Sequence, residues 1–301
     1  MPLHLTAACK TDAGQQREQN EDACYTHVVS DDDHTGGIFV VADGMGGYHA
    51  GEVASKIAVD TISAALMPLL APASSQPTVR LKKKKGGAKA EGAEAAPAAG
   101  EQGTNGARNP NETRALTESL VVEHYTDKLR DAIEGASDKI VEYGKEHPEA
   151  KGLGSTVTAA LVIGDQAFIA NVGDSRTYLL RGKQITRITT DHSLVERLVE
   201  AGQIERDDVY DHPHRNLIYR SLGGATRSEV DVDVFVERLQ PGDALLLCCD
   251  GLWEMVRDEQ IASILSEVED PAQAGEVLIE RANENGGEDN ITAVIVRVAE
   301  A

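Results

Sequence analysis

Residues 38–47 read IFVVADGMGG, a short apolar run that ends on Asp43 and is followed by three glycines within four residues. A continuous apolar run bounded by glycine is typical of a buried β-strand. Burying an unpaired carboxylate costs several kcal/mol, so this strand raises the question of what offsets the charge at its end. The glycines indicate that the chain just beyond Asp43 must be free to bend.

The same arrangement, an acidic residue at the end of an apolar strand, recurs along the chain. The acidic residues concerned are Asp250 in ALLLCCDG, Asp174 in AFIANVGDS, Asp289 in GGEDNITAVIV, and Glu21 and Asp22 in REQNEDA. A single Asp-Gly pair more often marks a turn. Several acids at the ends of very apolar strands are harder to explain in that way and indicate a shared role.

Strand ends in a packed sandwich of sheets meet at one rim, so we expect these carboxylates to be neighbours. Clustered carboxylates repel and raise each other's pKa, and a divalent cation removes that repulsion. Oxygen ligands without Cys or His select hard ions such as Mg²⁺ or Mn²⁺. Without a Cβ, Gly44 would let its backbone carbonyl approach an ion closely. One carboxylate can bridge two ions about 4 Å apart, and such pairs activate a water for in-line attack at phosphorus.

Arg17 stands four residues before Glu21. A guanidinium can hold a phosphate through two parallel hydrogen bonds. The alternative role for Arg17 is a surface ion pair with Glu21 or Asp22. Together, the acidic cluster and this arginine predict a site for a phosphorylated substrate.

The remaining patterns indicate the fold class. Hairpins are predicted where strand-like residues 155–163 and 167–172 flank Gly-Asp, and where residues 177–181 and 184–188 flank Gly-Lys. Further strands are expected at residues 230–236, 244–249 and 291–298, and helices at residues 54–66, 120–143, 261–268 and 272–282. This order predicts an α+β fold, a four-layer sandwich of two antiparallel sheets flanked by helices, rather than a βαβ repeat.

Residues 71–112 differ in composition, because they consist mainly of Ala, Gly, Pro, Ser, Lys and Glu with only Val79 and Leu81 as large aliphatic residues. Such a segment cannot bury enough surface to offset its ordering entropy. We therefore expect a disordered insert that joins two antiparallel helices. The four lysines at residues 82–85 are the signal for an alternative, a docking or nucleic-acid patch, but the composition favours the disordered insert.

The overall composition restricts the partners and the location. The 301 residues include 29 Lys and Arg against 50 Asp and Glu, a net charge of −21, which disfavours nucleic acid and anionic membranes as partners. The N-terminus lacks a secretory signal pattern, and we find no apolar stretch of about 18 residues that would span a membrane. The four cysteines Cys9, Cys24, Cys248 and Cys249 form no CxxC pair, so we predict reduced thiols in a cytoplasmic protein.

These motifs, in this order, resemble the PPM family of metal-dependent, type 2C Ser/Thr protein phosphatases, especially its bacterial branch. The matching stretches are REQNEDA, VVADGMGGYHAGEVAS, GLGSTVTAALV, IANVGDSRTYLLR, DHSLVERLVEAGQI, RNLIYRSLGG, LLLCCDGLWE and GEDNITAVIV. The resemblance covers nearly the whole chain except residues 71–112. It implies a single catalytic domain over residues 1–301, in which residues 190–222 form a flap beside the active-site cleft.

The resemblance also implies a set of metal ligands. Asp43 would bridge two metal ions. Asp250 and Asp289 would complete one metal site, and Glu21 with the carbonyl of Gly44 would complete the other.

Four further residues take supporting roles by the same resemblance. Asp22 would orient metal-bound water, and Arg17 would hold the substrate phosphate. Asp174, together with Asp250, would serve a third and weaker metal site. Asn290 would support the site beside Asp289.

The chain departs from the family pattern after Asp43. Many eukaryotic members have His where this chain has Met45, and that His is thought to protonate the leaving group, but bacterial members commonly lack it. Bacterial members often have His directly after the Gly-Gly pair, where this chain has Tyr48 followed by His49. Either His49 takes that role or the role is dispensable, and a surface histidine near a helix start is the simpler interpretation.

We therefore predict a phosphoprotein phosphatase for phospho-Ser and phospho-Thr, in which a metal-bridging hydroxide attacks phosphorus without a covalent intermediate. The expected cofactors are two Mn²⁺ or Mg²⁺ ions, with a third weaker site. The expected partners of the monomer are phosphorylated proteins, including a Ser/Thr kinase and its substrates. Two alternatives are a binding module without activity, which the complete set of acidic residues argues against, and a metallohydrolase for a nucleotide or small phosphate ester, which the sequence leaves open.

Overall fold

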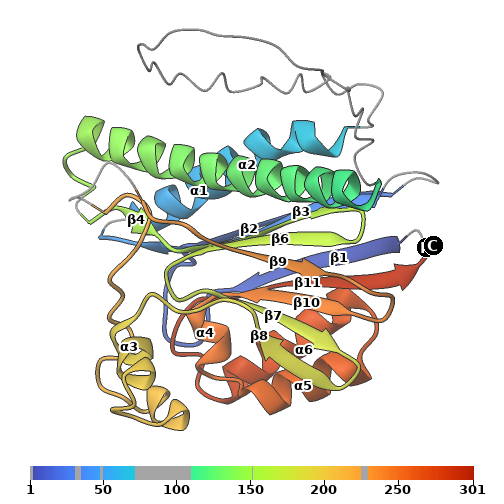
Figure 1. The fold of residues 1–301 in the computed structure, drawn as a ribbon. Coiled ribbons are helices and arrows are strands. Elements are labelled where there is room, and N and C mark those ends of the chain that lie inside the picture. The colour runs from blue at the N-terminus through green and yellow to red at the C-terminus, as the bar shows by residue number, and fades with distance from the viewer. Residues whose placement is uncertain (1–2, 31–34, 48–49, 72–109, 151, 225–229) are drawn as a thin grey trace, which may run out of the picture.

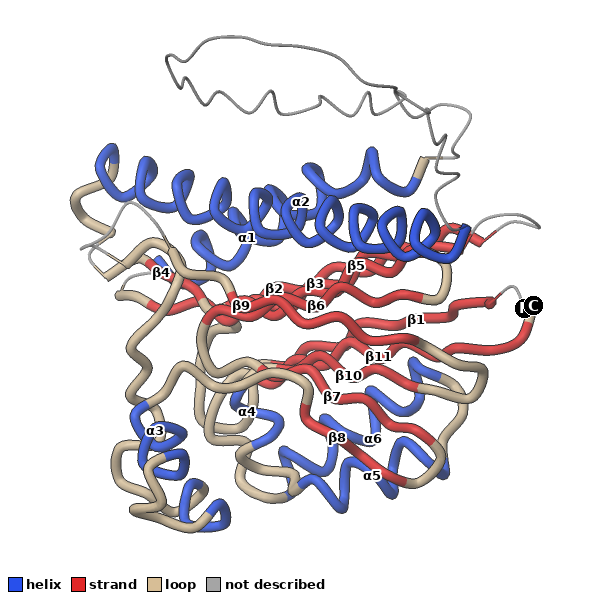
Figure 2. The backbone as a smooth tube through the Cα atoms, in the orientation of Figure 1, coloured by secondary structure: helices blue, strands red, loops and turns tan. Residues whose placement is uncertain are grey.

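Two antiparallel β-sheets pack face to face, and helices cover both outer faces (Figure 1). The structure, a computed structural model, describes residues 3–30, 35–47, 50–71, 110–150, 152–224 and 230–301. The helices, the two sheets and the second group of helices form successive layers (Figure 2). This arrangement confirms the predicted four-layer α+β sandwich.

The strand order of each sheet differs from the order in the chain. The first sheet runs β1 (Leu3–Asp12), β11 (Ile291–Glu300), β10 (Ala244–Cys248), β7 (Arg176–Arg181) and β8 (Gln184–Arg187). The second sheet runs β2 (Asp22–Ser30), β3 (Thr35–Met45), β5 (Val157–Ile163), β6 (Gln166–Val172) and β9 (Asp233–Arg238), with the short β4 (Gly154–Ser155) paired to β3. The two predicted hairpins are therefore the pairs β5–β6 and β7–β8.

The helices lie in three places. The outer face of the second sheet is covered by α1 (Ala50–Leu66), the short η1 (Met67–Leu70) and α2 (Pro110–Glu146). The outer face of the first sheet is covered by α4 (Asp250–Trp253), α5 (Asp258–Glu267) and α6 (Pro271–Glu284). The elements α3 (Leu194–Glu200) and η2 (Arg206–Val209) lie at one end (Figure 1), and Val195 and Val209 join them to the core on the outer face of the first sheet.

The inner strands are apolar on both faces because each face belongs to a different core. In β3, Ile38 and Val40 pack under α1 and α2, whereas Phe39 and Val41 pack between the sheets. Successive side chains of a strand point to opposite faces. Asp43 follows Val41 by two residues, so it lies on the side that faces the other sheet.

Element boundaries differ from the sequence expectations in a few places. As predicted, α1 and α2 lie side by side and run in opposite directions (Figure 1). However, α2 begins at Pro110, so residues 110–112 of the predicted insert are helical. Residues 72–109 of that insert, with the lysines at 82–85, lie outside the described residues, as does His49.

One apolar helix requires a correction to the expectation about membrane spans. Within the described residues, α1 and η1 together (Ala50–Leu70, 21 residues, mean hydropathy 1.5) are long and apolar enough to cross a membrane. This helix packs against β3 and α2, with Ala54, Ala58 and Ile62 fully buried. A core helix passes the same length and composition test, so the segment is weak evidence for a membrane span.

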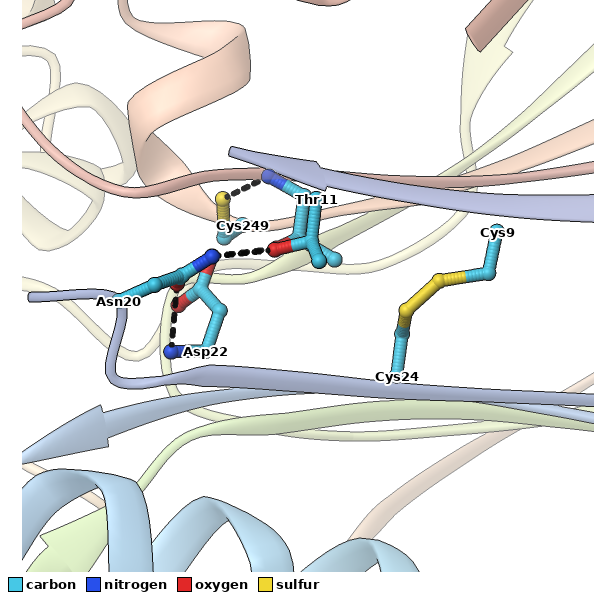
Figure 3. Close-up of a disulfide and its surroundings, with 7 residues drawn as sticks. Cys9, Thr11, Asn20, Asp22, Cys24 and Cys249 are labelled. Atoms are coloured by element: carbon cyan, nitrogen blue, oxygen red, sulfur yellow. Dashed lines mark hydrogen bonds between the residues drawn. A yellow bond between two sulfur atoms is a disulfide. The ribbon is translucent and has the colours of Figure 1, made fainter. Parts of the chain in front are cut away.

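The prediction of four reduced thiols is wrong for one pair, because Cys9 and Cys24 form a disulfide (Figure 3). Cys9 on β1 and Cys24 on β2 belong to facing edge strands of the two sheets and pack into the layer between them. Their Cα atoms are 6.5 Å apart. This contact depends on how the sheets stack, which a sequence separation of 15 residues does not reveal. Cys248 and Cys249 are free and buried.

Candidate active site

A cavity of about 270 Å³ lies where the two sheets meet at the end of β3 and β10. Its lining includes Arg17, Glu21, Asp43, Gly44, Asp174, Asp250, Asp289 and Asn290. These are all the predicted site residues except Asp22. In the described part of the lining, five carboxylates therefore surround one guanidinium.

The glycines that follow two of these acids are required by close backbone approach. A Cβ on Gly44 would collide with the backbone of Gly51 and Glu21, and a Cβ on Gly251 would collide with the carbonyl of Asn290. Neither glycine has a positive φ. The two Asp-Gly pairs therefore bring separate segments of the chain together, and the turn that a single Asp-Gly pair usually marks is not the reason for them.

Asn290 attaches the segment that carries Arg17 and Glu21 to the start of β11. Its side-chain amide donates hydrogen bonds to the carbonyls of Ala13 (3.0 Å) and Gln19 (2.8 Å). Its side-chain oxygen accepts a hydrogen bond from the backbone N–H of Glu21 at 2.8 Å. Asn290 is buried and all of its polar side-chain atoms are used, so it fixes the position of Glu21 at the rim of the cavity.

Arg17 forms an ion pair with Asp289, with 2.6 Å between Nη2 and Oδ2. The alternative role predicted from the sequence was an ion pair of Arg17 with Glu21 or Asp22, and neither residue forms this contact. Burial lowers the pKa of Arg17, but the charges of Asp289, Asp250 and Asp43 raise it overall. The arginine side chain is 51% exposed, so the pair contributes little to stability and its partner can be exchanged at small cost.

Burial and mutual repulsion change the acidity of the clustered carboxyls. Burial raises the pKa of both Asp43 and Asp250 well above the usual range, and each is raised further by neighbouring carboxylates. Burial raises the pKa of Asp174 to about 7, with a further contribution from Asp191. Burial also raises the pKa of Asp22 to about 6. When the pH is above these pKa values, the carboxyls are ionised and repel one another, and a bound divalent cation would relieve that repulsion.

The donor set fits a hard divalent cation. It consists of carboxylate oxygens and the carbonyl of Gly44, with no Cys or His in the described lining of the cavity. One oxygen of Asp22, Oδ1, is buried without a hydrogen-bond partner among the described residues. However, no three acidic, His or Cys side chains in the described ranges lie close enough together to hold an ion between them. The carboxylates share the cavity without converging on one point, so their roles as ligands stay predictions.

Several residues of the lining were given no role from the sequence. Asn216 and Ile218, in the segment predicted as the flap, face the cavity together with Thr156. Arg215 holds this segment in place through hydrogen bonds to Glu254 (2.9 Å) and Glu288 (2.7 Å). Asn216, Ile218 and Arg215 lie within the stretch RNLIYRSLGG, which contributed to the resemblance but contained no recognisable ligand pattern.

A sequence model of the family Protein phosphatase 2C matches residues 11–291. The chain belongs to the protein phosphatase 2C family. Among its relatives, the serine/threonine phosphatase stp of Listeria welshimeri is 35% identical over 292 residues, which cover 97% of this chain and 95% of the relative. The serine/threonine protein phosphatase PstP of Mycobacterium tuberculosis is 32% identical over 99% of this chain and 46% of its own length.

Solved structures of such phosphatases share the fold. The crystal structure of the M. tuberculosis serine/threonine phosphatase PstP/Ppp has a TM-score of 0.73 and 30% identity, and the match covers 98% of this chain and 99% of that one. The catalytic domain of PstP in complex with two manganese ions has a TM-score of 0.71 at 30% identity, covering 99% of this chain and 100% of that one. This protein phosphatase 2C is accordingly a Ser/Thr protein phosphatase of a metal-dependent family.

Proposed function

We propose that this phosphatase hydrolyses phospho-Ser and phospho-Thr in proteins by direct attack of water on phosphorus, at the cavity between the two sheets. The observation that carries the proposal is the set of five carboxylates and one arginine in a single cavity. An acidic cavity alone would repel a dianionic phosphate. The same cavity with bound cations would attract the phosphate.

The residues proposed to hold the cations are those that the family resemblance implies, and all of them line the cavity. Asp43 would be shared between two ions, with Asp250 and Asp289 on one side and Glu21 and the carbonyl of Gly44 on the other. When bound, the ions would activate a water for attack and offset the charge of the phosphoryl oxygens. The manganese ions of the PstP complex support Mn²⁺ as the metal. Mg²⁺ has the same preference for oxygen ligands, and Asp174 with Asp250 would form a third, weaker site.

The protein's own side chains supply the positioning. Arg17 would release Asp289 when that carboxylate turns to a cation, and its guanidinium would then bind two oxygens of the substrate phosphate. Asp22 would accept a hydrogen bond from the attacking water through Oδ1, the oxygen without a partner. A water in the open cavity would protonate the departing Ser or Thr oxygen, since the described lining contains no His.

The expected partners are phosphorylated proteins, including a Ser/Thr kinase and its substrates, and the names of the bacterial relatives support this class. We also propose a cytoplasmic monomer. The Cys9–Cys24 disulfide would be open to reduction there. Cell fractionation and light scattering of the purified protein test the location and the monomeric state.

The test of the proposed function is hydrolysis of p-nitrophenyl phosphate and of a phosphothreonine peptide, each with Mn²⁺ and with EDTA. We expect activity that requires the metal, and we expect Asp43→Asn to reduce kcat/KM by more than about 100-fold, the upper end of what loss of a supporting residue costs a metal site. Asp165→Asn is the matched control, because Asp165 forms an exposed ion pair with Arg238 far from the cavity.

Three outcomes would contradict the proposal. Turnover that survives EDTA would exclude the metal-dependent mechanism. Full activity of Asp43→Asn would exclude Asp43 as the shared ligand. Faster turnover of a nucleotide than of the phosphopeptide would identify a small phosphate ester as the substrate instead.

A further inference from the structure

A closed ring of hydrogen bonds lies behind the cavity and begins and ends at Asp22. Figure 3 shows the part of the ring that runs from Asp22 through Asn20 to Thr11. The backbone N–H of Asp22 donates to Oδ1 of Asn20 at 3.1 Å, and Nδ2 of Asn20 donates to Oγ1 of Thr11 at 2.8 Å. The hydroxyls of Thr11 and Thr292 are 2.7 Å apart, and Oγ1 of Thr292 donates to Oδ2 of Asp22 at 2.6 Å. The ring spans the layer between the two sheets, because Thr11 and Thr292 lie on β1 and β11 whereas Asp22 begins β2.

The chemistry of the groups determines the direction of every bond in the ring. A backbone N–H only donates, so the oxygen of the Asn20 amide faces Asp22 and its NH₂ faces Thr11. A carboxylate oxygen only accepts, so the single proton of the Thr292 hydroxyl belongs to Asp22. Thr292 must then accept from Thr11, which accepts from Asn20. Each hydroxyl donates once and accepts once, without alternatives.

Thr292 is itself held firmly. It is fully buried, and its backbone N–H donates to the Sγ of Cys249 at 3.0 Å. It pairs with Thr11 across β1 and β11. The hydroxyl that reaches Asp22 therefore comes from a rigid point of the opposite sheet and not from the segment that carries Asp22.

We propose that Thr292, supported by Thr11, is a positioning residue for the reaction. Its hydroxyl engages Oδ2 of Asp22 and leaves Oδ1 as the oxygen that receives the attacking water. This inference rests on the proposed function, in which Asp22 acts on that water. Of the two carboxylate oxygens, only Oδ1 forms no defined hydrogen bond within the described ranges. Burial raises the pKa of Asp22, and hydrogen bonding by Cys249 and Asp43 offsets part of that rise, so this carboxyl lies beside Asp43, which lines the cavity.

The test uses Thr292→Val, which keeps the shape of the side chain and removes the hydroxyl, assayed in the full chain with Mn²⁺ and p-nitrophenyl phosphate. Loss of a hydrogen bond to a charged group corresponds to a decrease in kcat on the order of tenfold or more. We expect KM and the calorimetric affinity for Mn²⁺ to stay within about twofold, because neither phosphate nor cation contacts Thr292. Thr292→Ser restores the hydroxyl and should recover most of kcat.

Thr158→Val is the matched control. Thr158 and Thr177 form another fully buried pair of hydroxyls at the same 2.7 Å separation. Their bond reaches no carboxylate. We expect this variant to lose stability in urea unfolding to a similar degree as Thr292→Val, while its kcat stays at the wild-type value.

A double-mutant cycle with Asp22→Ala separates positioning from a structural role. If Thr292 acts through Asp22, Thr292→Val lowers kcat no further once Asp22 is absent. The proposal is overturned by an unchanged kcat in Thr292→Val, by failure of Thr292→Ser to recover activity, or by equal losses in the wild-type and Asp22→Ala backgrounds. These outcomes are distinct from failure of the proposed function, which Asp43→Asn reports.

Discussion

His192 is a buried histidine whose surroundings favour the neutral ring. The backbone N–H of Gly173 donates to Nδ1 at 3.0 Å, and Nε2 lies 3.1 Å from Oδ2 of Asp233 and 2.9 Å from Nη1 of Arg220. Burial lowers the pKa of His192, and the charge of Arg220 lowers it further, against the opposing effects of Asp233 and Asp191. A proton on Nδ1 would face the Gly173 N–H. The folded state therefore resists protonation of this ring.

The sign of the resulting pH dependence follows directly. The unfolded chain takes up the histidine proton at about pH 6.5, whereas folded His192 does so only at lower pH, so its contribution to stability is lost as the pH falls below about 6.5. We expect urea unfolding of His192→Gln to change less between about pH 7.5 and pH 5.5 than that of the wild type. Raised carboxyl pKa values act in the opposite direction, so the difference between the two proteins is the quantity to compare.

An exposed histidine provides the control for this measurement. The variant His214→Gln makes the same substitution at an exposed position of the predicted flap and is measured in parallel. Identical pH dependence of His192→Gln and the wild type would contradict the assignment of a neutral buried ring.

At the scale of elements, the segment between β1 and β2 is closed at its base by the Cys9–Cys24 disulfide. Arg17, Glu21 and Asp22 all lie within this loop. The disulfide therefore shortens the free chain on which three predicted site residues are carried. It also joins the two sheets at their facing edges (Figure 3).

We expect removal of this disulfide to destabilise the protein. A closed loop of about 15 residues corresponds to roughly 3 kcal/mol of loop-closure entropy in the unfolded state. Dithiothreitol should therefore lower the free energy of unfolding measured in urea. The variant with both Cys9→Ser and Cys24→Ser should start at the lower value and show no response to the reductant. Equal stability of the oxidised and reduced wild type would contradict this expectation.

Local patterns in the sequence were enough to predict most of the helices and strands. The apolar runs that precede Asp43 and Asp250 are strands in the structure. Both hairpins form where a Gly-Asp or a Gly-Lys pair separates two strand-like runs. Apart from the apolar helix at residues 50–70 and the boundary of α2, the errors concern contacts between distant segments. The Cys9–Cys24 pair depends on how the sheets stack, and the choice of Asp289 as the partner of Arg17 depends on which strand ends meet. Neither has a periodic signal in the sequence.

At the scale of the whole molecule, three apolar cores are stacked in series. One lies under α1 and α2, one between the sheets, and one under α5 and α6. Strands β3 and β10 each contribute side chains to two of these cores. If either outer layer were lost, one face of β3 or β10 would be exposed to water. The other face of the same strand belongs to the middle core, so that core would be destabilised as well.

This sharing predicts one cooperative unfolding transition for the sandwich. In native-state hydrogen exchange, the amides of Val40 and Leu246 should exchange only through global unfolding, at the free energy measured by urea. Amides of η2, a single 3-10 turn of four residues, should exchange by local opening at a lower free energy. Slow exchange in β10 with faster exchange in β3 would show instead that the layers unfold separately.

The doubly buried strands have a second consequence, for pairing register. In a strand with one buried face, a slip by one residue exposes the apolar side chains, and this penalty fixes the alignment with its neighbours. Residues 38–42 are apolar on both faces, so within this central stretch of β3 a slip by one residue would keep apolar side chains on both faces. The alignment must come from its end, where Gly44 tolerates no side chain against Gly51 and Glu21. The charged end of β3 thus serves folding as well as chemistry, and a substitution there would misalign the sheet.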